Sequence, residues 1–508
     1  MAMVCSVLFR RPRASARRDE PVIFGDLNLD QVVAAVAAGR DEYDLRPFFH
    51  EPLRDVDAVE YRHRVVQDLE RDDVRSVVDE FAALMQRVRR HLRAVQERSS
   101  GYERQRYFLD AADLYCQAVT ALWSALARVE LASEGLAGLR EHLAGYLGSG
   151  AIQALARDAG DMLDELAAVR YCVHVRGAKV TVSRYEGQAD YTPEIVKTFA
   201  RFRQGEVADY RVRLRYYQDI NHVEEWILER VARLFPETFT ALADFCRLHV
   251  GFVDETVTTF DREVQFYLAY LTYMRRFTDA GLSFCCPEVS ATSKRLRVSG
   301  AFDLALATKL AGSGSEVVCN DIDLSDAERV VVVTGPNQGG KTTFARMFGQ
   351  LHYLAALGLP VPARSARLFL PDRVFTHFER EESLDTLHGK LEDELVRIHD
   401  VLDHATGDSV IVMNETFTST TLQDALVLGT QILSRIVDRD CLAVYVTFVD
   451  ELSLLSEATV SMVGMVVPDD PARRTFEVVR RAADGRAYAM ALAEKYGLTY
   501  EALRRRVG

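Results

Sequence analysis

Four consecutive valines, residues 330–333, run directly into a glycine-rich segment that ends in Lys341 and Thr342. An unbroken run of β-branched residues is typical of a strand buried on both faces of a parallel sheet. The glycines follow the pattern Gly335-x-x-x-x-Gly340, and a helical pattern extends from Lys341 to about residue 357. A strand, a glycine loop and a helix in this order predict a loop that binds phosphate groups. The alternative is a glycine-rich turn formed by chance, which we disfavour because strand, loop, lysine and helix are all in register.

The residue types in this loop suit a nucleoside triphosphate. Glycines allow backbone N–H groups to converge on an anion, and the start of the helix adds partial positive charge. The Lys341 ammonium can reach the β- and γ-phosphates, and the Thr342 hydroxyl is placed to ligate Mg²⁺. The predicted nucleotide-binding residues are Gly335, Pro336, Asn337, Gln338, Gly339, Gly340, Lys341, Thr342 and Thr343.

Length and composition indicate a protein with several domains and a large core. The 508 residues are 48% hydrophobic and 27% charged, and the net charge is −13. That charge argues against a general polyanion-binding surface but leaves room for a local basic groove. The eight cysteines include no C-x-x-C pair, which favours a reducing, cytoplasmic compartment. No apolar run approaches the length of a membrane span.

The first 18 residues carry five arginines and no acid. Two interpretations stay open: an organellar transit peptide, or a basic tail that is disordered in part, which we favour. We assign residues 1–44 to this N-terminal segment.

A long region from about residue 56 to residue 168 has helical periodicity, with apolar residues at three- and four-residue steps, and a shorter helical stretch precedes it. Predicted helices cover residues 30–38, 56–69, 75–95, 104–131, 136–147 and 151–169, and helices resume from 193 to 280. Alternating valines around Gly177 predict a small hairpin within residues 172–185. Residues 281–308 are turn-rich and predicted to be irregular. Strands are predicted at 330–333, 410–413 and 442–446, and helices alternate with them as in an α/β layer with a mostly parallel sheet.

The strand at 410–413 ends in Asn414-Glu415, a second candidate half of the site. In phosphate-loop ATPases an acid here holds Mg²⁺ and a second acid activates the attacking water. Glu415 suits the role of base. Asn414 is neutral, so it can accept a hydrogen bond from a magnesium-bound water without supplying charge. The alternative is a strand end that simply faces solvent.

Two nearby features modify this interpretation. The third strand ends in Thr447-Phe448, where a polar γ-phosphate sensor would be expected, and Phe448 cannot serve as one. Residues 416–421 are rich in hydroxyl groups, which either contact phosphate or cap the helix that starts near Leu422. We hold these two roles as equal alternatives.

The chain resembles the MutS family of ATPases in these and other motifs. Residues 335–342 match G-P-N-x-x-G-K-[ST], Cys319-Asn320-Asp321-Ile322 resembles the P-N-D-I element, and residues 52–62 match P-L-x-D-x-x-x-I-x-x-R of the core–lever domain. Further similarity lies at Glu394, 401–406, 484–489 and 493–498. The resemblance implies a multidomain chain, an all-α lever/core region at 45–300 followed by an α/β P-loop (ABC-type) ATPase domain at 301–508. Residues 172–255 would take the place of a reduced clamp.

The sequence also departs from this family in several places. Too few residues precede the lever to hold a mismatch-reading domain, and we expect no nuclease-like extension. Where the family has a pair of acids, this chain has Asn414-Glu415. Phe448 replaces the family's strand-end histidine, and Val317 replaces the aromatic residue that stacks on adenine. Gly389-Lys390 stands where a Ser-Thr reaches the phosphate bound by a partner subunit, and Lys390 could replace that hydroxyl.

The resemblance implies binding of ATP and Mg²⁺ at the interface of a homodimer, with slow hydrolysis coupled to movement of the levers. It also implies structure-selective or non-specific binding of DNA. The alternative is a nucleotide-gated scaffold that binds a protein partner and no DNA. A transport-type ATPase is a distant third, because no L-S-G-G-Q stretch or membrane partner segment is visible.

Overall fold

The structure is a computed structural model that describes residues 5–10, 19–97, 101–177, 179–188, 194, 197, 222–311, 313, 315–379, 389–468 and 470–483. The chain divides by packing into two units. Unit 1 comprises Met1–Arg75, Leu131–Leu139 and Thr258–Gly508, and unit 2 comprises Ser76–Glu130 and Arg140–Val257. These bounds differ from the division at residues 44 and 300, which stays a prediction.

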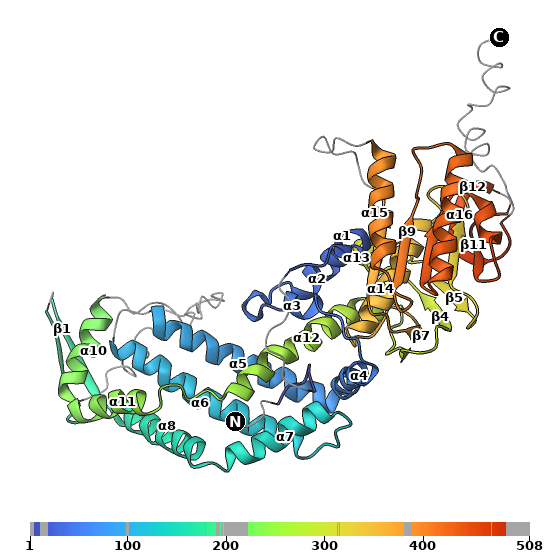
Figure 1. The fold of residues 1–508 in the computed structure, drawn as a ribbon. Coiled ribbons are helices and arrows are strands. Elements are labelled where there is room, and N and C mark those ends of the chain that lie inside the picture. Colours follow the sequence, from blue (N-terminus) through green and yellow to red (C-terminus); the bar gives the residue numbers. More distant parts are fainter. Residues whose placement is uncertain are drawn as a thin grey trace, which may run out of the picture. The chain divides into compact units, whose positions relative to one another are not determined.

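Unit 2 is built from helices and one hairpin (Figure 1). It contains most of α5 (Asp72–Glu97) and α7 (Glu134–Leu147), and all of α6 (Gly101–Leu126), α8 (Gly150–Ala168), α10 (His222–Leu234) and α11 (Pro236–Leu248). The hairpin pairs β1 (Tyr171–Arg176) with β2 (Lys179–Arg184) in antiparallel register around Gly177. The predicted helices and hairpin are confirmed here, while most of 193–221 lies outside the described residues.

The main sheet of unit 1 has six strands in the order β12-β11-β6-β10-β9-β8. All neighbours are parallel except the β11–β12 pair. The strands are β6 (Val330–Thr334), β8 (Val374–Phe378), β9 (Val410–Asn414), β10 (Leu442–Val446), β11 (Thr459–Val467) and β12 (Asp470–Arg480). The three predicted strands are therefore the centre of the sheet, and their apolar runs follow from burial on both faces.

Helices cover both faces of this sheet (Figure 1). α15 (Lys390–His404) and α16 (Leu422–Asp438) pack on one set of alternating side chains, which includes Val330, Val332 and Met413. α14 (Lys341–Ala356) packs on β9 and β10. A short helix, η2 (Asp450–Leu454), follows β10.

A second sheet of unit 1 corrects the prediction for residues 281–308. It has four strands in the order β3-β7-β4-β5, and β3 (Glu288–Ser290) and β4 (Leu296–Ala301) lie in the segment predicted to be irregular. The same segment continues into α13 (Leu304–Leu310), capped by Asp303. The other strands are β5 (Asn320–Leu324) and β7 (Ser365–Phe369). These strands are short and mix polar with apolar residues, which gives little periodicity to detect.

The N-terminal helices belong to unit 1. They are α1 (Ile23–Leu27), α2 (Leu29–Ala37), η1 (Asp41–Tyr43) and α3 (Arg46–Phe49), followed by α4 (Val56–Glu70), and α12 (Glu255–Thr278) lies later in the chain. α1 contacts β8 and α14, where Arg346 Nε and Gln350 Nε2 donate to backbone oxygens of Asp26 and Leu27.

Residues 5–10, part of the predicted basic tail, are packed between α4 and α12. The Glu263 carboxylate on α12 accepts hydrogen bonds from Ser6 and from the Val7 backbone N–H. The Arg62 guanidinium on α4 is fully buried and donates to Leu8 O at 3.1 Å and to Leu357 O at 2.7 Å. Arg62 therefore joins this N-terminal peptide to the end of α14.

Two further predictions concern membranes and cysteines. None of the helices in the described ranges is both long and apolar enough to cross a membrane. All eight cysteines are described, and all are free thiols.

Candidate functional site

The loop between β6 and α14 has a backbone that only glycine fits at key points. Gly335 has φ 115°, and a Cβ atom there would lie 2.9 Å from backbone atoms of Gly464 on β11. Gly340 has φ 93° and caps the N-terminus of α14. A side chain at either position would push the loop away from the sheet edge or strain its turn.

Lys341 is buried at the centre of this loop. Its Nζ atom lies 3.0 Å from Gly335 O, 3.3 Å from Pro336 O and 3.2 Å from Asn337 Oδ1. All three acceptors are neutral, and the nearest carboxylate, that of Glu415, is 3.9 Å away. Burial lowers the pKa of Lys341, and Glu415 acts in the opposite direction. The ammonium is therefore held in place with most of its charge uncompensated.

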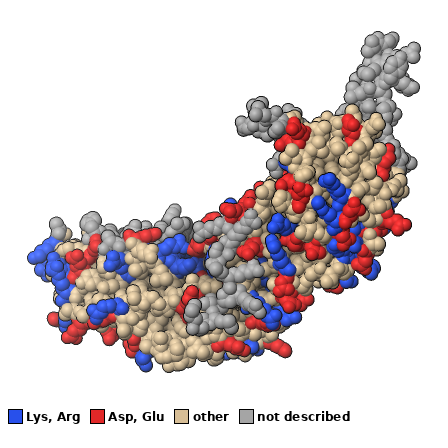
Figure 2. Space-filling model, in the orientation of Figure 1, with Lys and Arg blue, Asp and Glu red and all other residues tan. Residues whose placement is uncertain are grey.

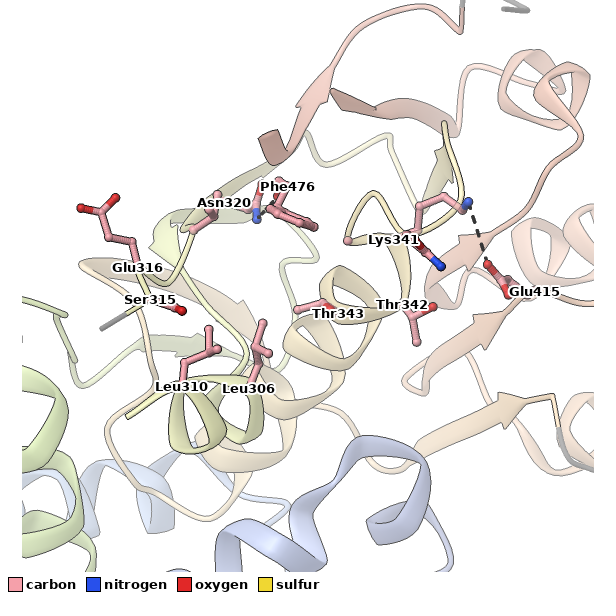
Figure 3. A pocket seen from close by; sticks show the side chains of 13 residues that line it. Leu306, Leu310, Ser315, Glu316, Asn320, Lys341, Thr342, Thr343, Glu415 and Phe476 are labelled. Atoms are coloured by element: carbon pink, nitrogen blue, oxygen red, sulfur yellow. Dashed lines mark hydrogen bonds and ion pairs between the residues drawn. The ribbon is translucent and has the colours of Figure 1, made fainter. Parts of the chain in front are cut away.

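A cavity of about 480 Å³ opens beside the loop (Figure 3). This volume is within the range of small-molecule sites. Residues of the loop and Glu415 line one part of the cavity. Residues of α13 and of the segment that follows it, several of them apolar, line the other part. The lining residues are Leu306, Leu310, Ser315, Glu316, Val318, Asn320, Gln338, Gly340, Lys341, Thr342, Thr343, Glu415 and Phe476.

Phe476 is a cavity residue that the sequence did not indicate. It lies on β12 with φ 63° and a half-exposed side chain. Asn320 fixes this strand, because its Oδ1 accepts from Val478 N at 2.6 Å and its Nδ2 lies 3.5 Å from Phe476 O. Val317, which stands at the family's aromatic position, is not among the lining residues. No local motif marks Phe476, since more than 130 residues separate it from the loop.

Glu415 follows β9 in a left-handed conformation, with φ 52°. Its backbone N–H donates to Val446 O at 3.0 Å, which ties it to the end of β10. The carboxylate is about one-third exposed and lines the cavity opposite Lys341 (Figure 3). A left-handed conformation costs a non-glycine residue about 1–2 kcal/mol, so the surrounding structure must hold it.

Asn414 is buried at the end of β9, and its Oδ1 atom has no hydrogen-bond partner in the part of the chain that the structure describes. A buried amide oxygen without a partner is unfavourable unless a ligand or a water completes it. Thr342 lines the cavity, and Asn414 directly precedes Glu415, which also lines it; hydroxyl and amide oxygens are ligand types that Mg²⁺ and its bound waters prefer. These residues fit a hydrated magnesium ion brought in with a nucleotide.

Other predicted site residues lie elsewhere. Phe448 follows β10 with 45% of its side chain exposed, so it offers no polar group at that strand end. Lys390 is the first residue of α15, and its side chain lies outside the described residues, as do 484–489 and 493–498. A phosphate contact by Lys390 therefore stays a prediction.

The hydroxyl groups after Glu415 serve the local structure. Thr421 is the N-cap of α16 and accepts a hydrogen bond from Asp424 N. Thr416 bonds to the Tyr445 hydroxyl, and Thr418 donates to Glu379 at 2.9 Å. Of the two alternatives for this segment, helix capping is observed at Thr421.

The part of the chain that contains this site is similar to known proteins. The family model for MutS domain V matches residues 331–505. The chain is 29% identical to Endonuclease MutS2 from Thermus thermophilus over 37% of this chain and 26% of that protein. It is 28% identical to DNA mismatch repair protein MutS from Rickettsia bellii over 37% and 22% of the two chains. The corresponding protein from Zymomonas mobilis is 30% identical over 35% and 21%.

These matches span about a quarter of the length of the curated relatives. The match to MutS domain V, over residues 331–505, includes the loop, Asn414 and Glu415. Residues 331–505, which hold Lys341 and the facing Glu415 carboxylate, therefore match domain V of the MutS family.

Proposed function

We propose that this protein is a MutS-related ATPase that binds ATP and Mg²⁺ in the cavity beside Lys341, in an ABC-type nucleotide domain. The observation that carries the proposal is the buried ammonium of Lys341, held by neutral oxygens of its own loop and facing the Glu415 carboxylate at 3.9 Å. In this arrangement the Lys341 ammonium can bind an anion, and the Glu415 carboxylate lies next to the position that the anion would occupy.

The residues divide between binding and chemistry. Backbone N–H groups of the loop from Asn337 to Lys341 and the N-terminus of α14 would bind the phosphates, and Thr342 and Asn414 would hold the magnesium shell. Bound Mg²⁺ would neutralise charge that develops on the phosphate oxygens. Glu415 would orient the attacking water and accept its proton.

Hydrolysis should be slow for two reasons. Asn414 supplies no negative charge to the metal, and the exposed Phe448 offers no hydrogen bond where a polar sensor would act. The loop N–H groups and the Lys341 ammonium, which would bind the phosphates, are all present, so nucleotide affinity should be of ordinary strength.

Glu415→Ala tests the central assignment. We expect the variant to bind ATP with an affinity close to that of wild type, because its carboxylate faces the ammonium rather than the loop N–H groups. Its single-turnover hydrolysis rate should fall by about 100-fold or more. Glu451→Ala, on the exposed face of η2, is the matched control and should hydrolyse normally. Equal turnover by wild type and Glu415→Ala would refute the role of Glu415 as the base.

Phe476 should bind the nucleotide base. The aromatic ring and the apolar side chains of Leu306, Leu310 and Val318 line the same cavity as the phosphate loop. Base–aromatic stacking contributes about 1–3 kcal/mol. We therefore expect Phe476→Ala to weaken ATP binding by about tenfold, measured by titration calorimetry. Binding of inorganic tripolyphosphate, which has no base, should not change, and a parallel loss for both ligands would contradict this role.

We also propose that ATP binding couples a homodimer to DNA, through movement of helices in the 45–300 region. This step rests on the similarity to the MutS family. The visible face of unit 1 adds no support, because basic and acidic residues are interspersed on it (Figure 2). DNA binding of this kind is sequence-independent and electrostatic. The logarithm of the affinity should fall linearly with the logarithm of salt concentration, as measured by fluorescence anisotropy. A flat response to salt would remove DNA from the proposal.

The second candidate is a nucleotide-gated scaffold for a protein partner. The net charge of −13 favours it, because repulsion from a polyanion must be overcome locally before DNA can bind. ATP turnover measured with branched, mismatched and single-stranded DNA separates the two. Stimulation by one DNA form supports the DNA-coupled ATPase, and tight ATP binding without any DNA effect supports the scaffold.

A further inference from the structure

The segment that begins at Glu415 follows an unfavourable backbone path. Glu415 and Phe417 both have left-handed conformations, with φ 52° and φ 60°, and neither is a glycine. Strain of this kind persists only where neighbouring groups fix the backbone. The direction in which the Glu415 side chain leaves the sheet therefore depends on what holds the residues that follow it.

Glu394 on α15 provides the central contact. Its Oε1 atom accepts a hydrogen bond from the backbone N–H of Phe417 at 2.9 Å. The same oxygen lies 3.3 Å from Nε2 of His377 on β8. Glu394 and His377 are both buried, and Phe417 has no exposed surface.

A carboxylate at this place is unusual for an apolar core. The side chains packed together here include Ile398, Leu402, Met413 and Phe417. Burying a carboxylate in such surroundings is unfavourable unless it satisfies specific partners. The partner that Glu394 satisfies is a backbone N–H two residues after Glu415, which would otherwise be buried without an acceptor.

We propose that Glu394 is a positioning residue for Glu415, with His377 orienting the Glu394 carboxylate. The contact joins α15 to the segment that presents the acid, so Glu415 is aimed into the cavity by a group that does not line it. This inference rests on the proposed function of Glu415. A displacement of about 1 Å at a reacting group reduces the rate by about 100-fold, so loss of the contact should affect the chemical step.

A purely structural role for Glu394 makes a different prediction. If it only attached α15 to the sheet, its removal would lower the melting temperature and weaken nucleotide binding and turnover together. A positioning role lowers kcat and leaves KM unchanged. The conservative replacement Glu394→Gln also distinguishes them, because its amide oxygen can take the place of Oε1 and still accept from Phe417 N.

The experiment compares four full-length variants in steady-state ATP hydrolysis, binding of a fluorescent ADP and thermal unfolding. Glu394→Ala should lower kcat by 10- to 100-fold with KM and ADP affinity within threefold of wild type. Glu394→Gln should recover kcat to within about threefold. His377→Ala should give an intermediate loss of kcat, and Asp400→Ala, on the exposed side of α15, should match wild type.

The outcomes separate this inference from the proposed function. If wild type is active and Glu394→Ala has the same kcat, the positioning role alone is overturned. The same holds if the kcat of Glu394→Gln is as low as that of Glu394→Ala. If Glu394→Ala does not fold, His377→Ala decides, and an unchanged kcat in that variant overturns the proposal. Wild type that hydrolyses no faster than Glu415→Ala removes the proposed function, and this inference with it.

Discussion

Replacing Lys341 by alanine should lower the affinity for ATP by about 100-fold. The Nζ atom is the buried cation closest to the loop, and its present partners are two backbone oxygens and an amide oxygen. Hydrogen bonds to charged groups contribute about 1.5–3 kcal/mol each, so losing contacts to two phosphate groups accounts for about 3 kcal/mol. Titration calorimetry with a non-hydrolysable ATP analogue measures the change directly.

The matched control for this variant is Lys309→Ala, which removes an exposed lysine from α13. Its affinity should equal that of wild type. If Lys341→Ala bound the analogue within threefold of wild type while remaining folded, the loop would not be the phosphate site, and the proposed function would have no basis.

Replacing Arg62 by alanine should have the largest effect on stability. The side chain is 1% exposed, and it donates to Leu8 O and Leu357 O. Its guanidinium carbon also lies 5.1 Å from the centre of the Phe9 ring and 5.5 Å from that of Phe266. Removal leaves two buried oxygens without donors and a cavity between them. We expect the free energy of unfolding to decrease by about 3–5 kcal/mol and the midpoint temperature of the first thermal transition to fall by about 10 °C.

Arg54→Ala serves as the control, because Arg54 is exposed and precedes the same helix. Its melting temperature should remain within 1–2 °C of wild type. Arg62→Lys should recover only part of the loss, since one ammonium cannot reproduce the fixed fork of the guanidinium. An Arg62→Ala protein that melts like wild type would show that the N-terminal peptide contributes nothing to unit 1.

The central sheet was predictable because its strands are buried on both faces. β6, β9 and β10 are nearly pure runs of valine, isoleucine and other apolar residues, and such runs have few alternatives. The helices of unit 2 were predictable for a similar reason, since their apolar stripes repeat over many turns. The four-stranded sheet was missed because β3 has only one apolar residue and β5 alternates acids with its apolar residues.

The candidate site divides in the same way. Lys341 and Glu415 were predictable because Lys341 ends the loop that follows β6 and Glu415 directly follows β9, and parallel strands present their ends at one edge of a sheet. The sequence marked Glu394 only as a point of similarity to the MutS family and predicted no contact for it, and it gave no signal at all for Phe476. Both reach the site through tertiary packing, and no spacing in the chain encodes the contacts of Glu394 with Phe417 or of Phe476 with the loop.

The peptide of residues 5–10 also sets an order of events during synthesis. Ser6 lies 257 residues before its partner Glu263, and Arg62 lies 295 residues before Leu357. Unit 2 falls between these partners in the sequence, and its contacts are mostly local by comparison. Contacts between distant residues form late, and domains fold as units while the chain emerges. Unit 2 should therefore fold first on the ribosome. The N-terminal peptide and Arg62 can make their contacts only after Glu263 and Leu357 have been synthesised.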